Sequence, residues 1–258
     1  MAALIGLATI LTVLTFVWVL SLRLQDASVA DICWGLGFVM LAWLYCFLSP
    51  ALTLRSWLIG AMTTLWGTRL SAHIFQRHHG KGEDPRYQAM RASHGSAFWW
   101  RSLFTVFCVQ GAILWFVALP LLVAVRATQP VALTAVDGLG ILLFAVGLGF
   151  EAVGDYQLER FRAEPLNRGT VLDRGLWRYT RHPNYFGDAT IWWGMYAMAA
   201  STPRGWLTVL SPSLMMWLLM RVSGVTLLEN GLNASKPGYR AYVARTPAFF
   251  PWFPRLPR

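Results

Sequence analysis

The sequence predicts an all-helical protein that spans a membrane about seven times. Three observations support this fold class. Only 13% of the 258 residues are charged, about half the share found in a soluble domain. These charges leave long apolar stretches between them, and most of the basic residues fall on one side of those stretches. Backbone polar groups cannot face lipid unsatisfied, so apolar stretches of this length must be helices.

Seven apolar segments follow one another along the chain, each close to the ~20 residues that cross ~30 Å of hydrocarbon. The first is uncharged and lacks both a basic leader and a cleavage site. We therefore expect it to be a membrane helix and not a signal peptide. The predicted spans are Ala2–Leu20, Ala30–Leu48, Leu54–Phe75, Leu103–Val125, Val136–Gly154, Tyr185–Ala200 and Trp206–Leu228.

The basic residues predict the orientation. With seven spans, 18 of the 22 Lys and Arg side chains lie on one face of the membrane, 3 lie on the other, and Arg221 lies inside the last span. The positive-inside rule makes the basic face cytoplasmic, which puts the N-terminus outside and the C-terminus inside. This topology also accounts for most of the net charge of +10, so we do not expect a nucleic acid partner.

The run Leu176–Asp188, which enters the sixth span, is the most informative for chemistry. Asn184 and Asp188 are four residues apart and share a helix face at the membrane boundary. An acid just inside a membrane helix is costly unless it is paired or functional. Arg178 and Arg181, beside a helix N-terminus, form a natural anion site. The alternative is a capped helix start whose arginines only set the topology.

Two other features place charge at the end of one predicted span and inside another. Glu151, Asp155 and Glu159 are spaced by four and share a face at the end of the fifth span, with Arg162 close by. They form either a functional site or a solvated helix end with internal ion pairs. Arg221, in the last span, needs a carboxylate or a bound phosphate unless it snorkels to the cytoplasmic surface.

The loop after the third span holds three histidines near two acids, Glu83 and Asp84. Their spacing matches no recognised ligand motif, and the surrounding positive charge repels a cation, so we expect no metal. The sequence contains neither a P-loop nor a GxGxxG run. Any dinucleotide would therefore bind outside a Rossmann fold.

The run Gly175–Asp188 resembles the C-terminal signature of the steroid 5α-reductase and sterol reductase superfamily, and the tail Pro237–Pro251 is similar to the endings of the same families. The resemblance covers the second half of the chain, from about Glu151 onward. The first half resembles a bacterial branch of the superfamily, at Asp31–Gly35 and in the loop Gly80–Tyr87.

This resemblance implies a seven-helix reductase of the bacterial cytoplasmic membrane. NADPH would bind on the cytoplasmic side and give hydride to a double bond in a steroid, sterol or isoprenoid-like lipid that enters from the bilayer. The phosphates of NADPH suit the basic pocket. Within one membrane domain, 1–258, residues 1–134 would form the lipid-substrate half and 135–258 the cofactor half. The candidate cofactor-binding residues are Asp155, Arg162, Arg178, Arg181, His182, Asn184, Tyr185, Arg221, Tyr239 and Tyr242.

The resemblance also suggests where the proton comes from. Asp188, Tyr87 or a bound water would deliver it to the second carbon, and Asp31 is a further candidate acid. The 5α-reductases use a Gln-Glu pair on helix two and a Tyr on helix three. This sequence has no Gln-Glu pair, and Ile74 stands at the position of the Tyr. The substrate class is therefore left open.

Two alternatives belong to other classes. The isoprenylcysteine and phospholipid methyltransferases, which use S-adenosylmethionine, share an RHPxYxG run and a similar tail. That cofactor is cationic at sulfur and lacks phosphates, so the surplus of arginines favours NADPH. A lipid-binding scaffold without catalysis would leave the Asn184–Asp188 pair and Arg221 without a purpose.

Overall fold

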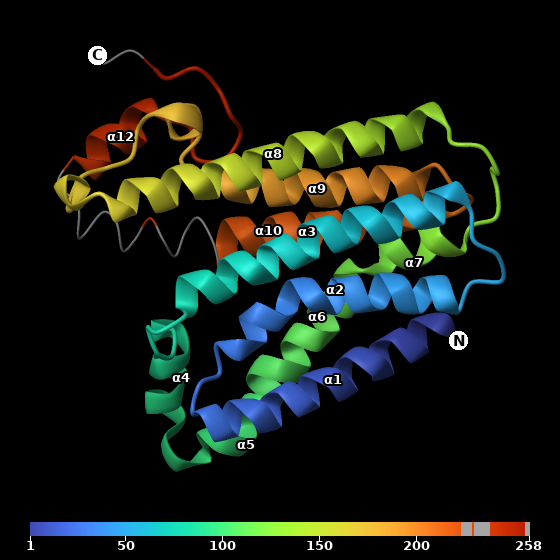
Figure 1. Cartoon of the computed structure of the whole chain (residues 1–258), viewed down its shortest axis with the longest axis horizontal. Coiled ribbons are helices and arrows are strands. Elements are labelled where there is room, and N and C mark those ends of the chain that lie inside the picture. Colours follow the sequence, from blue (N-terminus) through green and yellow to red (C-terminus); the bar gives the residue numbers. More distant parts are fainter. Residues whose placement is uncertain (223–228, 230–237, 256–258) are drawn as a thin grey trace. The chain divides into compact units, whose positions relative to one another are not determined.

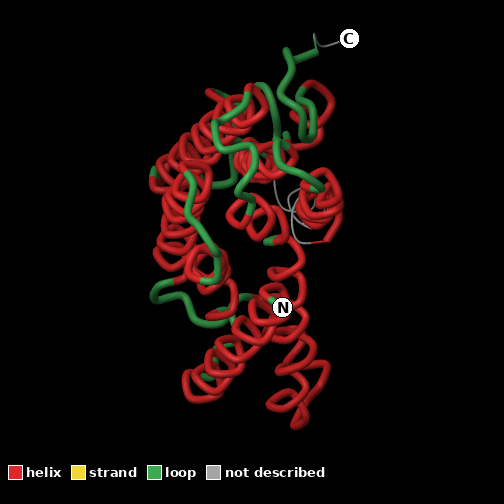
Figure 2. Tube along the Cα trace, turned by 90° about the vertical axis from the view of Figure 1, so that its right-hand side faces the viewer, coloured by secondary structure: helices red, strands yellow, loops and turns green. Residues whose placement is uncertain are grey.

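The computed structural model describes residues 1–222, 229 and 238–255, and every regular element in these ranges is a helix (Figure 2). The predicted all-helical class is confirmed for this part of the chain. The chain divides into two compact units. Unit 1 comprises Met1–Thr134 and Ala199–Thr208, and unit 2 comprises Ala135–Met198 and Val209–Arg258.

Five stretches of the described residues are long and apolar enough to cross a membrane, and they coincide with five of the predicted spans. Helices also form over the third and sixth predicted spans, as α3 (Leu54–His78) and α9 (Pro183–Ala200), but these two are not among the five. Residues 223–228 of the last predicted span lie outside the described residues. The five stretches are Ala2–Leu24, Val29–Phe47, Pro85–Arg126, Ala135–Ala163 and Gly205–Val222.

In unit 1, α1 (Ala2–Leu24), α2 (Val29–Phe47) and α3 lie alongside one another (Figure 1). The contact between α2 and α3 is the most extensive. A Cβ atom at Gly35 would lie 2.2 Å from the carbonyl oxygen of Gly67, so the two backbones touch directly, as small residues allow in membrane helix pairs. The fourth predicted span is an interrupted helix made of α5 (Phe98–Ser102), a π-helical stretch (Leu103–Cys108), α6 (Val109–Val117) and α7 (Leu119–Arg126).

The segment 76–102, expected as a loop, contains the helix α4 (Pro85–His94). Its start follows from the local sequence. The carboxylate of Asp84 accepts a hydrogen bond of 2.9 Å from the backbone N–H of Arg86, and Pro85 occupies the first helical position, where its missing N–H costs nothing. The Asp-Pro pair could therefore have predicted this helix.

In unit 2, α8 (Ala135–Ala163) and α9 run antiparallel along a seam of glycines (Figure 1). A Cβ at Gly147 would lie 2.6 Å from the carbonyl oxygen of Gly187, and one at Gly140 would lie 2.7 Å from that of Gly194. The glycines of each helix are seven residues apart, so they return to the same face and keep the two backbones in contact. α8 continues to Ala163, nine residues past the end of the predicted span.

The remaining elements of the described chain are short. The C-terminal tail is joined to the segment before α9 by backbone hydrogen bonds of 2.9 Å, from the N–H of Arg181 to the carbonyl of Pro247 and from the N–H of Trp252 to that of Tyr179. This contact positions the tail beside the Arg-His-Pro run. The short elements are Gly95–Ala97, Pro165–Asn167, Gly175–Arg178, Gly205–Val209, α10 (Leu210–Trp217), Leu218–Val222 and α12 (Tyr239–Arg245).

Candidate functional site

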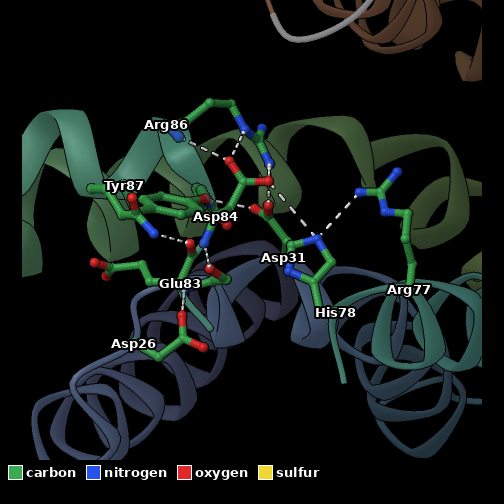
Figure 3. Close-up of polar contacts among 11 residues, drawn as sticks. Asp26, Asp31, Arg77, His78, Glu83, Asp84, Arg86 and Tyr87 are labelled. Carbon is green, nitrogen blue, oxygen red and sulfur yellow. Dashed lines mark hydrogen bonds and ion pairs between the residues drawn. The ribbon is translucent and has the colours of Figure 1, made fainter. Parts of the chain in front are cut away.

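Unit 1 holds a largely half-buried polar group that we call the Asp31 cluster, made of Asp31, Asp84, Arg86, Tyr87 and Gln110. Figure 3 shows the first four of these residues. Three helices supply it. Asp31 lies in the first turn of α2, Arg86 and Tyr87 lie in the first turn of α4, and Gln110 lies in α6. The structure thus brings together two of the residues predicted to be catalytic, Asp31 and Tyr87.

The two carboxylate oxygens of Asp31 have different partners. The hydroxyl of Tyr87 donates to Oδ1 at 2.6 Å, and Nη2 of Arg86 donates to Oδ2 at 2.7 Å. Nε2 of Gln110 donates to the Tyr87 oxygen at 2.9 Å and lies 3.4 Å from Oδ1. Tyr87 is only 5% exposed. A carboxylate, a phenol and an amide therefore form a hydrogen-bonded chain whose central phenol is buried.

Asp84 and His78 determine the charge next to Arg86. Nε of Arg86 donates to Asp84 at 2.9 Å. Burial alone would raise the pKa of Asp84, but the hydrogen bonds from Arg86 outweigh it and hold the pKa below its ordinary value. Burial, aided by Arg77, lowers the pKa of His78, whose Nε2 lies 3.8 Å from Asp84. At pH 7 Asp84 is thus ionised and His78 neutral, so Arg86 balances two carboxylates.

Glu83 fixes the loop that carries this cluster. Its Oε1 accepts from Nη2 of Arg91 and from the backbone N–H of Ala27, both at 2.8 Å. The N–H of Asp84 donates to Oγ of Ser28 at 2.7 Å. These bonds tie the start of α4 to the start of α2, which holds Tyr87 and Asp31 in register.

Unit 2 contains a second polar group, the Arg181 cluster, made of Arg181, His182 and Glu229. Glu229 accepts from Nε of Arg181 at 2.8 Å, from Nη2 at 3.1 Å and from Nε2 of His182 at 3.0 Å. Nη1 of Arg181 donates to the carbonyl of Thr246 at 2.6 Å. Burial raises the pKa of Glu229, but the bonds from His182 and Arg181 outweigh it and lower the pKa to about 2. Arg181 therefore anchors the tail to the start of α9.

Asn184 contacts another predicted residue. Its Nδ2 donates to Oδ1 of Asp155 at 3.0 Å, which joins α9 to α8. Asp155 is 5% exposed. The ring of Tyr185 stacks on His182 with centroids 5.6 Å apart and planes within 7°. Asp188 follows one turn later on α9 and is half-buried.

Both tyrosines of α12 are buried. The hydroxyl of Tyr242 donates to the carbonyl of Trp177. Burial raises the pKa of Tyr239 to about 12 and raises that of Tyr242 as well, so both phenols are protonated at pH 7. Tyr242 thereby pins α12 to the segment before α9.

The other predicted cofactor residues present charge to solvent. Arg162, Arg178 and Arg221 are exposed, as are three further arginines between residues 160 and 178. Unit 2 therefore has an accessible basic surface, while its Arg181 is engaged internally. The three further arginines are Arg160, Arg168 and Arg174.

Sequence reasoning gave no site role to four residues of these clusters, which are Asp84, Arg86, Gln110 and Glu229. Gln110 is an amide within an otherwise largely apolar span, and such a residue usually marks a polar contact inside the membrane. That signal could have found it. Glu229 lies 48 residues from Arg181, and nothing local links the two.

The chain is similar to an uncharacterised protein of Schizosaccharomyces pombe, with 26% identity over 76% of this chain and 63% of that protein, so the chain spans less than two thirds of that relative. A probable O-methyltransferase of Ustilaginoidea virens is 39% identical over 61 residues, which cover 24% of this chain and 21% of that protein. No solved structure matches the chain. The family described as a protein of unknown function, DUF1295, matches residues 17–246, and the chain belongs to that family.

Proposed function

We propose that this protein is an NADPH-dependent reductase that adds hydride and a proton across a carbon-carbon double bond of a lipid. We further propose that it crosses the membrane seven times, with the N-terminus outside and both polar clusters on the cytoplasmic side. The observation that carries the proposal is the hydrogen-bonded chain of Gln110, Tyr87 and Asp31.

The residue types in this hydrogen-bonded group support a reductase. The 5α-reductases, which the sequence resembles, use a Gln, an acid and a Tyr. Here the sequence positions differ, since Ile74 stands where the Tyr is expected. Nevertheless Gln110, Asp31 and Tyr87 meet from three different helices. A Gln, an acid and a Tyr are therefore brought together here from different sequence positions.

The cluster suits proton delivery. Reduction of a double bond needs a hydride at one carbon and a proton at the other. An oxygen-oxygen distance of 2.6 Å between Tyr87 and Asp31 lets a proton pass between phenol and carboxylate. The amide of Gln110 donates to the phenol oxygen and would stabilise it after its proton leaves, while Arg86 compensates the charge on Asp31.

The accessible basic surface of unit 2 fits a phosphate-bearing cofactor. NADPH supplies a hydride when it is bound. Arg162 and Arg178 are exposed, and guanidinium groups bind phosphate well. Arg181 and His182 would act differently from the expectation above, because Glu229 already engages them. They would hold the start of α9 in place, so that Asn184 and Asp155 keep their position.

Methyl transfer from S-adenosylmethionine is the second candidate, and the match to the probable O-methyltransferase favours it. In that reaction the Tyr87–Asp31 pair would accept the proton released by a hydroxyl acceptor. S-adenosylmethionine carries no phosphate, however, so it does not use the accessible basic surface of unit 2 as NADPH would.

Thermal shift in detergent separates the two candidates. NADPH at saturating concentration should raise the melting temperature, whereas S-adenosylmethionine should not. Arg162→Ala and Arg178→Ala should each reduce the NADPH shift, and Arg23→Ala, an exposed arginine in the other unit, should leave it unchanged. Stabilisation by S-adenosylmethionine alone would contradict the reductase proposal.

A further inference from the structure

A cavity of about 660 Å³ lies in unit 1, where α1 begins and where α2 and α7 end. Its volume falls within the range of roughly 300–1,000 Å³ typical of small-molecule sites. Ile5, Leu48, Leu122 and Val123 give it an apolar side, and Thr128 and Gln129 are among the polar residues that line the rest. The apolar side is suited to an acyl chain.

One charged side chain lines this cavity, that of Arg126, and the described residues lining it include no acid. Arg126 is half-buried, and its Nη1 donates to the carbonyl of Leu48. Among the described residues no carboxylate contacts it. A guanidinium held beside an apolar wall without a counter-ion favours an anionic ligand.

The cavity is separate from the Asp31 cluster. Asp31 lies in the first turn of α2, whereas Leu48 caps its last turn. The 19 residues of α2, at a rise of about 1.5 Å each, put its two ends roughly 27 Å apart. An occupant of the cavity therefore plays no part in the proposed proton transfer, and the inference stands independently of the proposed reaction.

We propose that this cavity binds an anionic phospholipid of the surrounding bilayer. The lipid phosphate contacts Arg126, and one acyl chain lies against Leu48, Leu122 and Val123. Phosphate suits a guanidinium because the planar fork of N–H donors matches its oxygens. α7 ends at Arg126, and a cation at the end of a membrane helix lies at the level of the lipid head groups.

Native mass spectrometry of the whole protein in detergent tests this, with phosphatidylglycerol and phosphatidylcholine of identical acyl chains added in equal amounts. The wild type should retain one phosphatidylglycerol at least several-fold more often than phosphatidylcholine. Arg126→Gln should abolish that preference, and Arg126→Lys, which keeps the cation, should retain most of it. Arg23→Gln removes an exposed cation at the other end of α1 and should change nothing.

Three results would overturn the proposal. The wild type could retain both lipids equally, Arg126→Gln could keep the preference, or Arg23→Gln could lose it to the same extent. If Arg126→Gln does not fold, Ala127→Phe gives a second test, because it fills the cavity and leaves Arg126 in place. A folded Ala127→Phe protein that still retains the lipid would also refute the site.

Discussion

The Arg181 cluster makes a quantitative prediction for Glu229→Gln, which removes the charge but keeps the size of the side chain. The side chains of Arg181 and His182 are only 9% and 4% exposed, so the substitution leaves a buried guanidinium without its counter-ion. The pKa of Glu229 lies at about 2, against an ordinary 4.5, and at about 1.36 kcal/mol per pKa unit this corresponds to ~3 kcal/mol. Water at the rim of the cluster reduces the figure to about 2 kcal/mol.

The sign of the pH dependence follows from the lowered pKa. The stabilisation by ionised Glu229 is fully present above pH 4.5 and is lost as the pH falls toward 2. In detergent at pH 7, Glu229→Gln should lower the melting temperature by about 4–8 °C. The difference from the wild type should be smaller at pH 3. Light scattering and tryptophan fluorescence during heating would measure both values.

Glu164→Gln is the matched control, because Glu164 is an exposed acid in the same unit. It should shift the melting temperature by no more than about 2 °C. Equal melting of wild type and Glu229→Gln at pH 7 would refute the reasoning. A difference that stays constant from pH 7 to pH 3 would show that the carboxylate charge is not its cause.

Three further predictions follow from the fold and the Asp31 cluster. Tyr87→Phe should lower the reductase rate at least about 100-fold and leave the NADPH thermal shift intact; a full rate would exclude Tyr87 as the proton donor. Gly147→Val should destabilise unit 2 by about 2 kcal/mol or more, because its Cβ would meet α9. A Cβ at Gly149 would meet nothing within 4 Å, so Gly149→Val should be tolerated. Equal melting temperatures of the two variants would contradict the close packing of glycines between α8 and α9. The topology can be tested in a variant that lacks the three native cysteines and carries one new cysteine. On intact cells, a membrane-impermeant maleimide should label the protein with Pro203→Cys and should not label the protein with Arg168→Cys. Labelling of both proteins would contradict the seven-span topology.

Much of the fold could be predicted from the sequence because the bilayer imposes a length and a polarity on each helix. All seven apolar segments fall on helices within the described residues. The prediction missed two helical stretches, because neither of them depends on crossing the bilayer. α8 runs on past the end of the predicted span to Ala163, and α4 forms in a polar segment where Asp84 and Pro85 start it.

The clusters could be predicted only in part. The Arg-His-Pro-Asn run pointed to residues that do meet other elements of unit 2, as the bond between Asn184 and Asp155 shows. The pairing of Arg181 with Glu229 depends instead on how the tail folds back, which no periodicity encodes. Likewise Gln110 lies 79 residues from Asp31, and only the packing of α6 beside α2 brings them together.

The glycine seam between α8 and α9 has a consequence for biogenesis. α9 is not among the stretches that are apolar and long enough to cross a membrane by themselves. During synthesis α8 leaves the ribosome first, and its glycine face, centred on Gly147, gives α9 a partner as soon as it emerges. Insertion of the two helices as one hairpin would let the glycine face of α8 cover one side of α9. A side chain at Gly147 would therefore act before folding is complete, and its first effect would be loss of membrane-integrated protein.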